Sequence, residues 1–312
     1  MPANPLKPIL LIALGGNALI KKGEQGTVAE QLANLKVPTR QIATLANDYR
    51  IIITHGNGPQ VGNLLLQQEQ CHSTAPLPLE ILVAQTQGQI GYMIESTLDS
   101  ELMALGINTK PLVSLISYVV VNDKDPAFAN PSKPIGPIYS EDEVAALPFP
   151  VRKTAKGYRR VVASPHPVTI VEKREIMQLI EMDFIVICCG GGGIPVIRER
   201  RAFSGVEAVI DKDLASARLA QEVGVDLFII ATDVEGVALD YGQPSQRFLR
   251  TLSATQAARY LLDDQFPAGS MQPKVEAAMQ FVGNQGKRAV ITSLTNIASA
   301  VRRQAGTEFT ID

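Results

Sequence analysis

Cysteine and histidine are scarce in this sequence. The 312 residues include three cysteines, Cys71, Cys188 and Cys189, and three histidines, His55, His72 and His166. A small, odd number of cysteines argues against a disulfide framework and favours a reducing compartment. The histidines are far apart and lack the spacing of a zinc site, so we assign no metal ligands. Cys188 and Cys189 end an apolar run, and we expect both to be small buried residues of a strand.

The sequence also lacks an excess of charge and long apolar runs. Lysine and arginine number 29 against 31 for aspartate and glutamate, which gives a formal net charge of −2. Such a balance does not suggest a nucleic-acid-binding protein. The apolar run at residues 9–14 is too short for a membrane span or a signal-peptide core. We therefore expect a cytoplasmic protein that binds neither nucleic acid nor membrane.

Familiar nucleotide-binding fingerprints are missing as well. The chain contains no GxxxxGK[ST] loop and neither the His-Arg-Asp nor the Asp-Phe-Gly motif of protein kinases. Residues 56–62 have GxGxxxG spacing with a rigid Pro59, whereas a dinucleotide-binding loop has GxGxxG spacing. The sequence therefore disfavours a P-loop hydrolase, a Rossmann dehydrogenase and a protein kinase.

What is present is an alternation of short apolar runs with helix-like segments. Strands are predicted at residues 8–14, 50–54, 184–189, 226–231 and 287–292, and helices at 28–47, with an interruption near Pro38, 79–105, 214–223 and 274–282. The strands are nearly continuous Ile, Val and Leu, which predicts that both of their faces are buried. We predict an α/β fold in which one domain, residues 1–312, forms a three-layer αβα sandwich around a mainly parallel open sheet.

Residues 122–167 break this alternation. The segment is rich in proline and contains the basic residues Arg152, Lys153, Lys156, Arg159 and Arg160. Long stretches without periodic structure are often functional excursions. We predict a small subdomain that projects from the sheet, with a plain surface loop as the alternative.

Three of the predicted strands end in glycine clusters, namely Gly15-Gly16-Asn17, Gly56-Asn57-Gly58 and the four glycines at 190–193. Ligands of open α/β sheets bind beyond the carboxyl ends of the strands. Glycine allows close approach of the backbone to an anion, and a following helix N-terminus offers N–H groups. One such cluster is often only a tight turn, but three together indicate an anion site.

Lysines in unusual surroundings accompany these clusters. Lys133 and Lys274 each follow proline-containing segments, and taken singly each is typical of a surface lysine. Lys212 lies between Asp211 and Asp213 at a predicted helix start. This triplet is either a plain helix cap or a charged group in which Lys212 points into the site and Asp213 orients it together with a second lysine.

Together these segments resemble the carbamate kinases of the amino acid kinase superfamily. The motifs that carry the resemblance span nearly the whole chain, at residues 13–18, 54–62, 125–128, 133–137, 159–162, 206–213, 232–236 and 266–271. The resemblance implies an amino-acid-kinase-like fold, a homodimer and a projecting subdomain at about 122–167. It also implies that the N-terminal half, about 1–183, binds carbamate and that the C-terminal half, about 184–312, binds the nucleotide.

The resemblance further implies the reaction ATP + carbamate = ADP + carbamoyl phosphate, which often serves ATP formation in the catabolism of arginine or other nitrogen compounds. Mg²⁺ is expected on the phosphates of ATP or ADP. The implied catalytic residues are Lys133, Lys212, Asp213 and Lys274. The implied substrate-binding residues are Gly15, Gly16, Asn17, Gly56 and Asn57. The implied nucleotide-binding residues are Asp233, Gly236, Met271 and Lys274.

The sequence departs from the family pattern at Ala163, His166 and Gln272, where proline, lysine and glycine are common. Two other interpretations therefore stay open. One is a kinase of the same fold that acts on another small carboxylate. The other is a non-catalytic sensor of the nucleotide or of carbamoyl phosphate.

Overall fold

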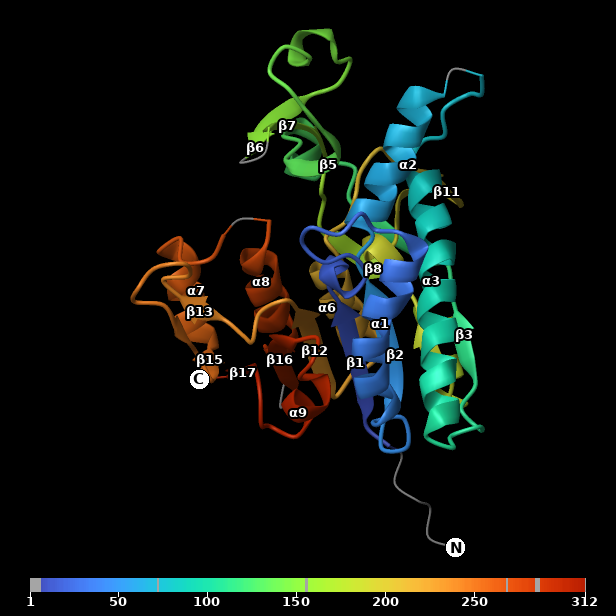
Figure 1. Ribbon diagram of the computed structural model, residues 1–312, viewed down its shortest axis with the longest axis vertical. Coiled ribbons are helices and arrows are strands. Elements are labelled where there is room, and N and C mark those ends of the chain that lie inside the picture. The colour runs from blue at the N-terminus through green and yellow to red at the C-terminus, as the bar shows by residue number, and fades with distance from the viewer. Residues whose placement is uncertain (1–6, 72, 155–156, 268, 284–286, 312) are drawn as a thin grey trace, which may run out of the picture.

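An eight-stranded, mainly parallel sheet forms the centre of the computed structural model, which describes residues 7–71, 73–154, 157–267, 269–283 and 287–311 (Figure 1). His72, Lys156 and Ala268 lie outside the described residues. The strand order is β15-β17-β16-β12-β1-β2-β9-β3, and the β16–β17 pair alone is antiparallel among the pairs of this described sheet. The strands are β1 (Ile9–Leu14), β2 (Arg50–His55), β3 (Leu112–Ser114), β9 (Ile185–Ile187), β12 (Leu227–Thr232), β15 (Thr251–Ser253), β16 (Arg288–Ser293) and β17 (Thr307–Thr310).

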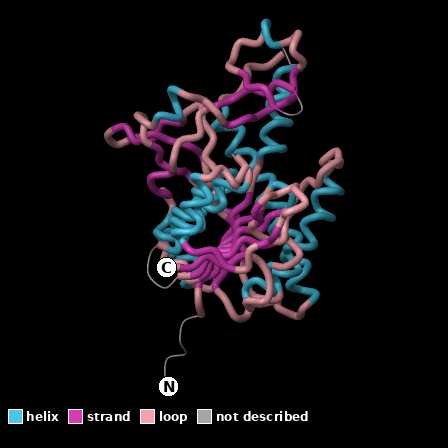
Figure 2. The backbone as a smooth tube through the Cα atoms, turned by 90° about the vertical axis from the view of Figure 1, so that its left-hand side faces the viewer, coloured by secondary structure: helices cyan, strands magenta, loops and turns pink. Residues whose placement is uncertain are grey.

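Helices cover both faces of this sheet (Figure 2). One face packs on α1 (Val28–Ala43), α3 (Leu79–Ala104) and α9 (Ile297–Val301), and the other on α5 (Lys173–Glu181), α6 (Lys212–Glu222), α7 (Ala254–Leu262) and α8 (Met271–Val282). Along β1, Leu10 and Ile12 point to the first face and Leu11 and Ala13 to the second, and all four are fully buried. The predicted αβα sandwich with doubly buried strands is therefore confirmed.

Smaller sheets surround this core. The strands β11 (Ala202–Gly205), β10 (Ile194–Glu199), β4 (Tyr118–Val121) and β8 (Pro167–Ile170) form one of them, and β13 (Ala238–Leu239) pairs with β14 (Arg247–Phe248). The strands β5 (Lys133–Tyr139), β7 (Gly157–Val162) and β6 (Val151–Thr154) form a three-stranded sheet that projects at the top of Figure 1, and we call this sheet the lobe. Regular pairing in the lobe replaces the plain loop that the sequence left as an alternative. The helix α2 (Gly58–Gln70) lies beside the lobe, and short helical segments lie at α4 (Pro126–Ala129), η1 (Gly16–Ala18), η2 (Val144–Ala146) and η3 (Gly190–Gly192).

Two details differ from the sequence-based expectation. Pro38 lies inside α1 and does not interrupt it. Proline removes one backbone hydrogen bond, but burial of the apolar face of the helix outweighs this loss. Cys188 and Cys189 are buried and free, yet β9 ends at Ile187. Cys189 adopts the left-handed conformation, with φ of 50°, because the chain turns there into the glycine cluster.

No helix in the described part of the chain is long and apolar enough to cross a membrane.

Candidate active site

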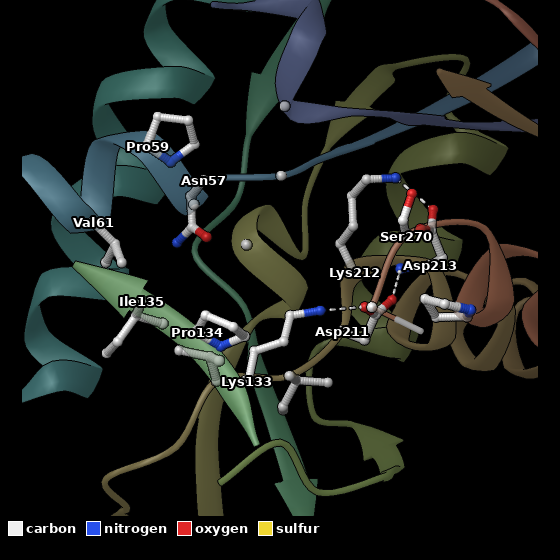
Figure 3. A pocket seen from close by; sticks show the side chains of 18 of the residues that line it. Asn57, Pro59, Val61, Lys133, Pro134, Ile135, Asp211, Lys212, Asp213 and Ser270 are labelled. Atoms are coloured by element: carbon white, nitrogen blue, oxygen red, sulfur yellow. Dashed lines mark hydrogen bonds and ion pairs between the residues drawn. The ribbon is translucent and has the colours of Figure 1, made fainter. Parts of the chain in front are cut away.

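A cavity of about 290 Å³ opens at the carboxyl ends of the central strands (Figure 3). The turns after β1 and β2 form one side of it, the lobe covers it through β5, and the starts of α6 and α8 complete the wall. The sequence predicted this location, because parallel strands place their carboxyl ends at one edge of a sheet.

The glycine turns pack against one another at the floor of this cavity. Gly16, Gly56 and Asn57 line it, and so does Gly191 from the third cluster. A Cβ on Gly191 would lie 2.2 Å from Asn57 Nδ2, and its φ is 66°, so only glycine fits this position. Asn57 Nδ2 donates to Thr86 Oγ1 at 2.9 Å, which holds the start of α2 in place. A helix N-terminus in this setting suits an anion.

Gly15 and Asn17 do not line the cavity. The N–H of Gly15 donates to the carbonyl of Ala231 at 2.9 Å, and this bond extends the pairing of β1 with β12. Asn17 is exposed in η1. The substrate-binding roles of both residues stay predictions.

Asp213 pairs with two lysines that lie 62 positions apart in the chain. Lys212 begins α6, and Lys274 lies in the first turn of α8. Asp213 is 2% exposed; its Oδ1 accepts a hydrogen bond from Lys212 and its Oδ2 accepts one from Lys274 at 2.8 Å. Burial opposes the charge of Asp213, but the two ammonium groups hold its pKa well below the ordinary range. Asp213 is therefore ionised at neutral pH.

Electrostatics at the cavity favour a bound anion. Burial lowers the pKa of Lys212, and Asp213 opposes this shift. Burial also acts against the charge of Lys274, yet Asp213 raises the pKa of this lysine above its ordinary value. Lys133 Nζ pairs with Asp211 Oδ2 at 2.7 Å. Among the described residues, three ammonium groups and two carboxylates therefore line the cavity, which leaves an excess of positive charge.

A second cavity of about 110 Å³ lies on the other side of the start of α8. The four residues that the sequence analysis assigned to the nucleotide all line it, and they are Asp233, Gly236, Met271 and Lys274. Tyr241 and Phe266 add aromatic surface. Ser270 and Lys274 line both cavities, so the two cavities meet at the first turn of α8.

Three described residues that shape this site received no individual role from the sequence. Asp211 pairs with Lys133, Gly191 packs on Asn57, and Ser270 separates the two cavities. Asp211 and Gly191 belong to motifs already recognised, but the pairing of Asp211 with Lys133 joins positions 78 residues apart and follows from the fold. Ser270 carries no signal of its own in the sequence.

The departures from the family pattern lie off the two cavities. Ala163, His166 and Gln272 are absent from the described residues that line either one. The N–H of His166 donates to Asp125 at 3.0 Å, and Gln272 Nε2 donates to Glu276 at 2.9 Å. None of these three residues therefore belongs to the described walls of either cavity.

His55 is a buried histidine at the end of β2, beneath the turn that lines the first cavity. Burial lowers its pKa to about 4, the hydrogen bond of Nδ1 with the carbonyl of Gly56 at 3.1 Å opposes this shift, and the charge of Lys212 adds to it. The imidazole is therefore neutral at physiological pH, and it spares the site a further positive charge.

We expect His55 to make folding stability depend on pH between about 6.5 and 4. The unfolded chain binds this proton at the ordinary pKa of 6.5 and the folded chain only near 4, so stability falls as pH decreases through this window. The shift corresponds to a loss of about 3 kcal/mol. Urea unfolding of the wild type and of His55→Asn at pH 7, 5.5 and 4 measures this loss of stability.

The His55→Asn variant should lose less stability than the wild type over this pH range. His166→Asn, on an exposed segment, serves as the control. Parallel curves for wild type and His55→Asn would contradict the prediction.

Comparison with known proteins agrees with this geometry. The sequence profile of the amino acid kinase family matches residues 8–293. A carbamate kinase of Thermococcus kodakarensis is 45% identical over 309 residues, which cover 96% of this chain and 98% of the relative. A carbamate kinase of Haemophilus influenzae is 44% identical over 306 residues, with 96% of each chain covered. The solved structure of Giardia lamblia carbamate kinase bound to AMP-PNP matches with a TM-score of 0.90 at 37% identity and covers 98% of this chain and 99% of that chain. The chain therefore belongs to the amino acid kinase family and, within it, to the carbamate kinases, which are phosphotransferases.

Proposed function

We propose that this chain catalyses the reversible transfer of a phosphoryl group between ATP and carbamate, with ADP and carbamoyl phosphate as the other pair of reactants. The observation that carries the proposal is Asp213, which holds Lys212 and Lys274 at the junction of two cavities. A transferring phosphoryl group has to lie between a nucleotide on one side and its acceptor on the other. The arrangement supplies positive charge at that junction.

Each charged residue has a distinct role in this proposal. Lys274 borders both cavities and binds the terminal phosphates of the nucleotide, and Lys212 stabilises the phosphoryl group during transfer. Asp213 supplies the counter-charge that the two ammonium groups share and aims them at the reacting group. Phosphoryl transfer requires positioning and charge stabilisation more than covalent help, so preorganised lysines and backbone N–H groups suffice.

The remaining residues divide between the two halves of the chain. Lys133 and the turns at Gly16 and Gly56 belong to residues 1–183, and we assign carbamate and carbamoyl phosphate to the cavity that they line. Asp233, Gly236 and Met271 belong to residues 184–312, and we assign the nucleotide to the second cavity. The Giardia relative bound to AMP-PNP supports an ATP-shaped ligand in a chain of this fold.

Mg²⁺ fits this site only as a partner of the nucleotide. The described residues contain no group of three or more His, Cys, Asp or Glu side chains that could hold a metal ion. Mg²⁺ commonly takes one or two carboxylates and completes its shell with phosphate oxygens and water. Asp233, an exposed carboxylate on the second cavity, suits this role. The ion would neutralise phosphate charge, and the lysines would act on the oxygens that remain.

The test is formation of ATP from ADP, Mg²⁺ and carbamoyl phosphate in a coupled assay, with acetyl phosphate as the comparison substrate. We expect turnover with carbamoyl phosphate and little with acetyl phosphate. Preference for acetyl phosphate would assign the chain to another small carboxylate. Binding of ADP without turnover of either substrate would assign it to a sensor.

We expect Lys133→Ala to raise KM for carbamoyl phosphate far more than KM for ADP. Lys133 lines the first cavity and is absent from the described lining of the second, so its loss removes a charge from one substrate only. A charged hydrogen bond supports a change of about tenfold or more. Initial rates with each substrate varied in turn measure the two constants. Equal increases in both would place Lys133 elsewhere.

We propose that the chain forms a homodimer through the β3 edge of the main sheet. An unpaired strand edge readily accepts a second chain. Tyr92 of α3 is 70% exposed, Ile116 after β3 is 50% exposed, and a groove of about 520 Å³ lies between α3 and β3. Light scattering after gel filtration should give twice the chain mass for the wild type and a smaller mass for Tyr92→Glu. A wild-type monomer would refute the dimer.

We also place the protein in the cytoplasm and its reaction in ATP formation during the catabolism of arginine or other nitrogen compounds. Three free cysteines support a reducing compartment. Fractionation of the native cells, followed by detection of the protein, tests the compartment. Growth of a deletion strain on arginine tests the pathway, and unimpaired growth would argue against it.

A further inference from the structure

Asp211 divides its carboxylate between two parts of the molecule. Oδ1 accepts the N–H of Asp213 at 2.9 Å and thereby caps α6. Oδ2 accepts a hydrogen bond from Nζ of Lys133, which lies on β5 of the lobe, at 2.7 Å (Figure 3). One side chain thus fixes both the start of α6, which carries Lys212, and the lysine that reaches across the cavity from the lobe.

We infer that Asp211 is a positioning residue that holds Lys133 over the cavity until an anionic substrate replaces Asp211 as the partner of this lysine. The inference rests on the proposed function, because it concerns how Lys133 reaches carbamoyl phosphate. The two side chains are 29% and 12% exposed, so water screens their attraction less than that of a surface pair. The lysine ammonium has three donors on a flexible stem, which allows it to exchange a carboxylate for a phosphate.

This exchange has a kinetic signature. Asp211 competes with the substrate phosphate for Lys133. It therefore weakens binding of the ground state as well as orienting the lysine. Removing Asp211 should therefore tighten binding of the ground state. The orientation of Lys133 is lost at the same time, so the transition state gains nothing, and KM and kcat fall together.

Asp211→Asn separates the two functions of the side chain. Asparagine is as good an N-cap as aspartate, so the start of α6 is kept while the charge on Oδ2 is lost. We expect KM for carbamoyl phosphate and kcat both to fall about fivefold, with little change in kcat/KM. The matched control is Asp263→Asn, which removes one carboxylate from an exposed pair with Arg259 at 3.6 Å at the C-terminal end of α7 and should change neither constant.

A double-mutant cycle with Lys133→Ala identifies the route of the effect. If Asp211 acts through Lys133, the decrease in KM caused by Asp211→Asn disappears in the Lys133→Ala background. The same decrease in both backgrounds would overturn the inference, because Asp211 would then act through α6 or through its charge alone. An unchanged KM and kcat in the single variant would overturn it as well.

Hydrogen exchange of the ligand-free protein tests the pairing without activity. We expect amides of β5 and β7 to exchange faster in Asp211→Asn and in Lys133→Ala, and no faster again in the double variant. Unchanged exchange in Asp211→Asn would refute the anchoring role. A wild type that fails to form ATP from carbamoyl phosphate would sink the proposed function, while this exchange result would still decide whether Asp211 anchors Lys133.

Discussion

Replacing Lys212 with alanine is expected to lower kcat by at least about 100-fold, the scale for loss of one preorganised charge-stabilising donor. Lys212 begins α6, its ammonium group is held by Asp213, and it lines the cavity between the lobe and the glycine turns. Its role is proposed for the transferring phosphoryl group, so KM for ADP should change little. Initial rates of ATP formation from carbamoyl phosphate measure both constants.

The chain provides a matched control for this experiment. Lys110 is also a buried lysine in an ion pair, with 5% side-chain exposure and a distance of 2.5 Å to Asp183, but it lies away from both cavities. Lys110→Ala should reduce stability and leave kcat near the wild-type value. A near-normal kcat for Lys212→Ala would remove this lysine from the mechanism. Loss of activity in both variants would trace the effect to folding or to the dimer proposed at the groove between α3 and β3, which Lys110 lines.

The second large effect is expected for Asp213→Asn. Asparagine preserves the shape of the side chain but leaves Lys212 and Lys274 close together without a shared counter-charge. Removing one partner from a buried ionic group costs about 3–5 kcal/mol of stability. We also expect kcat to fall by at least about 100-fold, because both lysines lose the group that directs them. Urea unfolding and initial rates measure the two effects.

The pH dependence of this stability has a definite sign. The pKa of Asp213 is depressed in the folded chain, so its contribution to stability is present at neutral pH and is lost only as pH falls below the ordinary value of 3.8.

Inorganic phosphate should stabilise Asp213→Asn more than the wild type, because an anion can replace the missing carboxylate between the lysines. A variant as stable as the wild type, with no greater response to phosphate, would show that the two lysines do not depend on Asp213.

Several elements of this protein follow directly from local sequence. The apolar runs of β1, β2 and β12 are continuous, and each predicts a strand buried on both faces. The helix α3 spans Leu79–Ala104, close to the predicted 79–105. Boundaries near special backbone conformations were less accurate. The strand β9 stops before Cys188, because the turn that begins at Cys189 depends on packing against Asn57 and His55.

The amino-acid sequence by itself determined the layered fold and identified the glycine and lysine motifs that line the first cavity, because apolar periodicity and such motifs are properties of short segments. The tertiary structure decided which charges meet. Asp213 lies between two lysines from α6 and α8, and Asp211 pairs with a lysine 78 positions earlier in the chain. The local motif predicts the pairing of Asp213 with Lys212, but it specifies neither Lys274 as the second lysine nor Lys133 as the partner of Asp211, since these depend on how the lobe and the two helices pack around the sheet. Only the folded chain brings these side chains within hydrogen-bonding distance and shields them from water. This shielding strengthens the attraction between opposite charges.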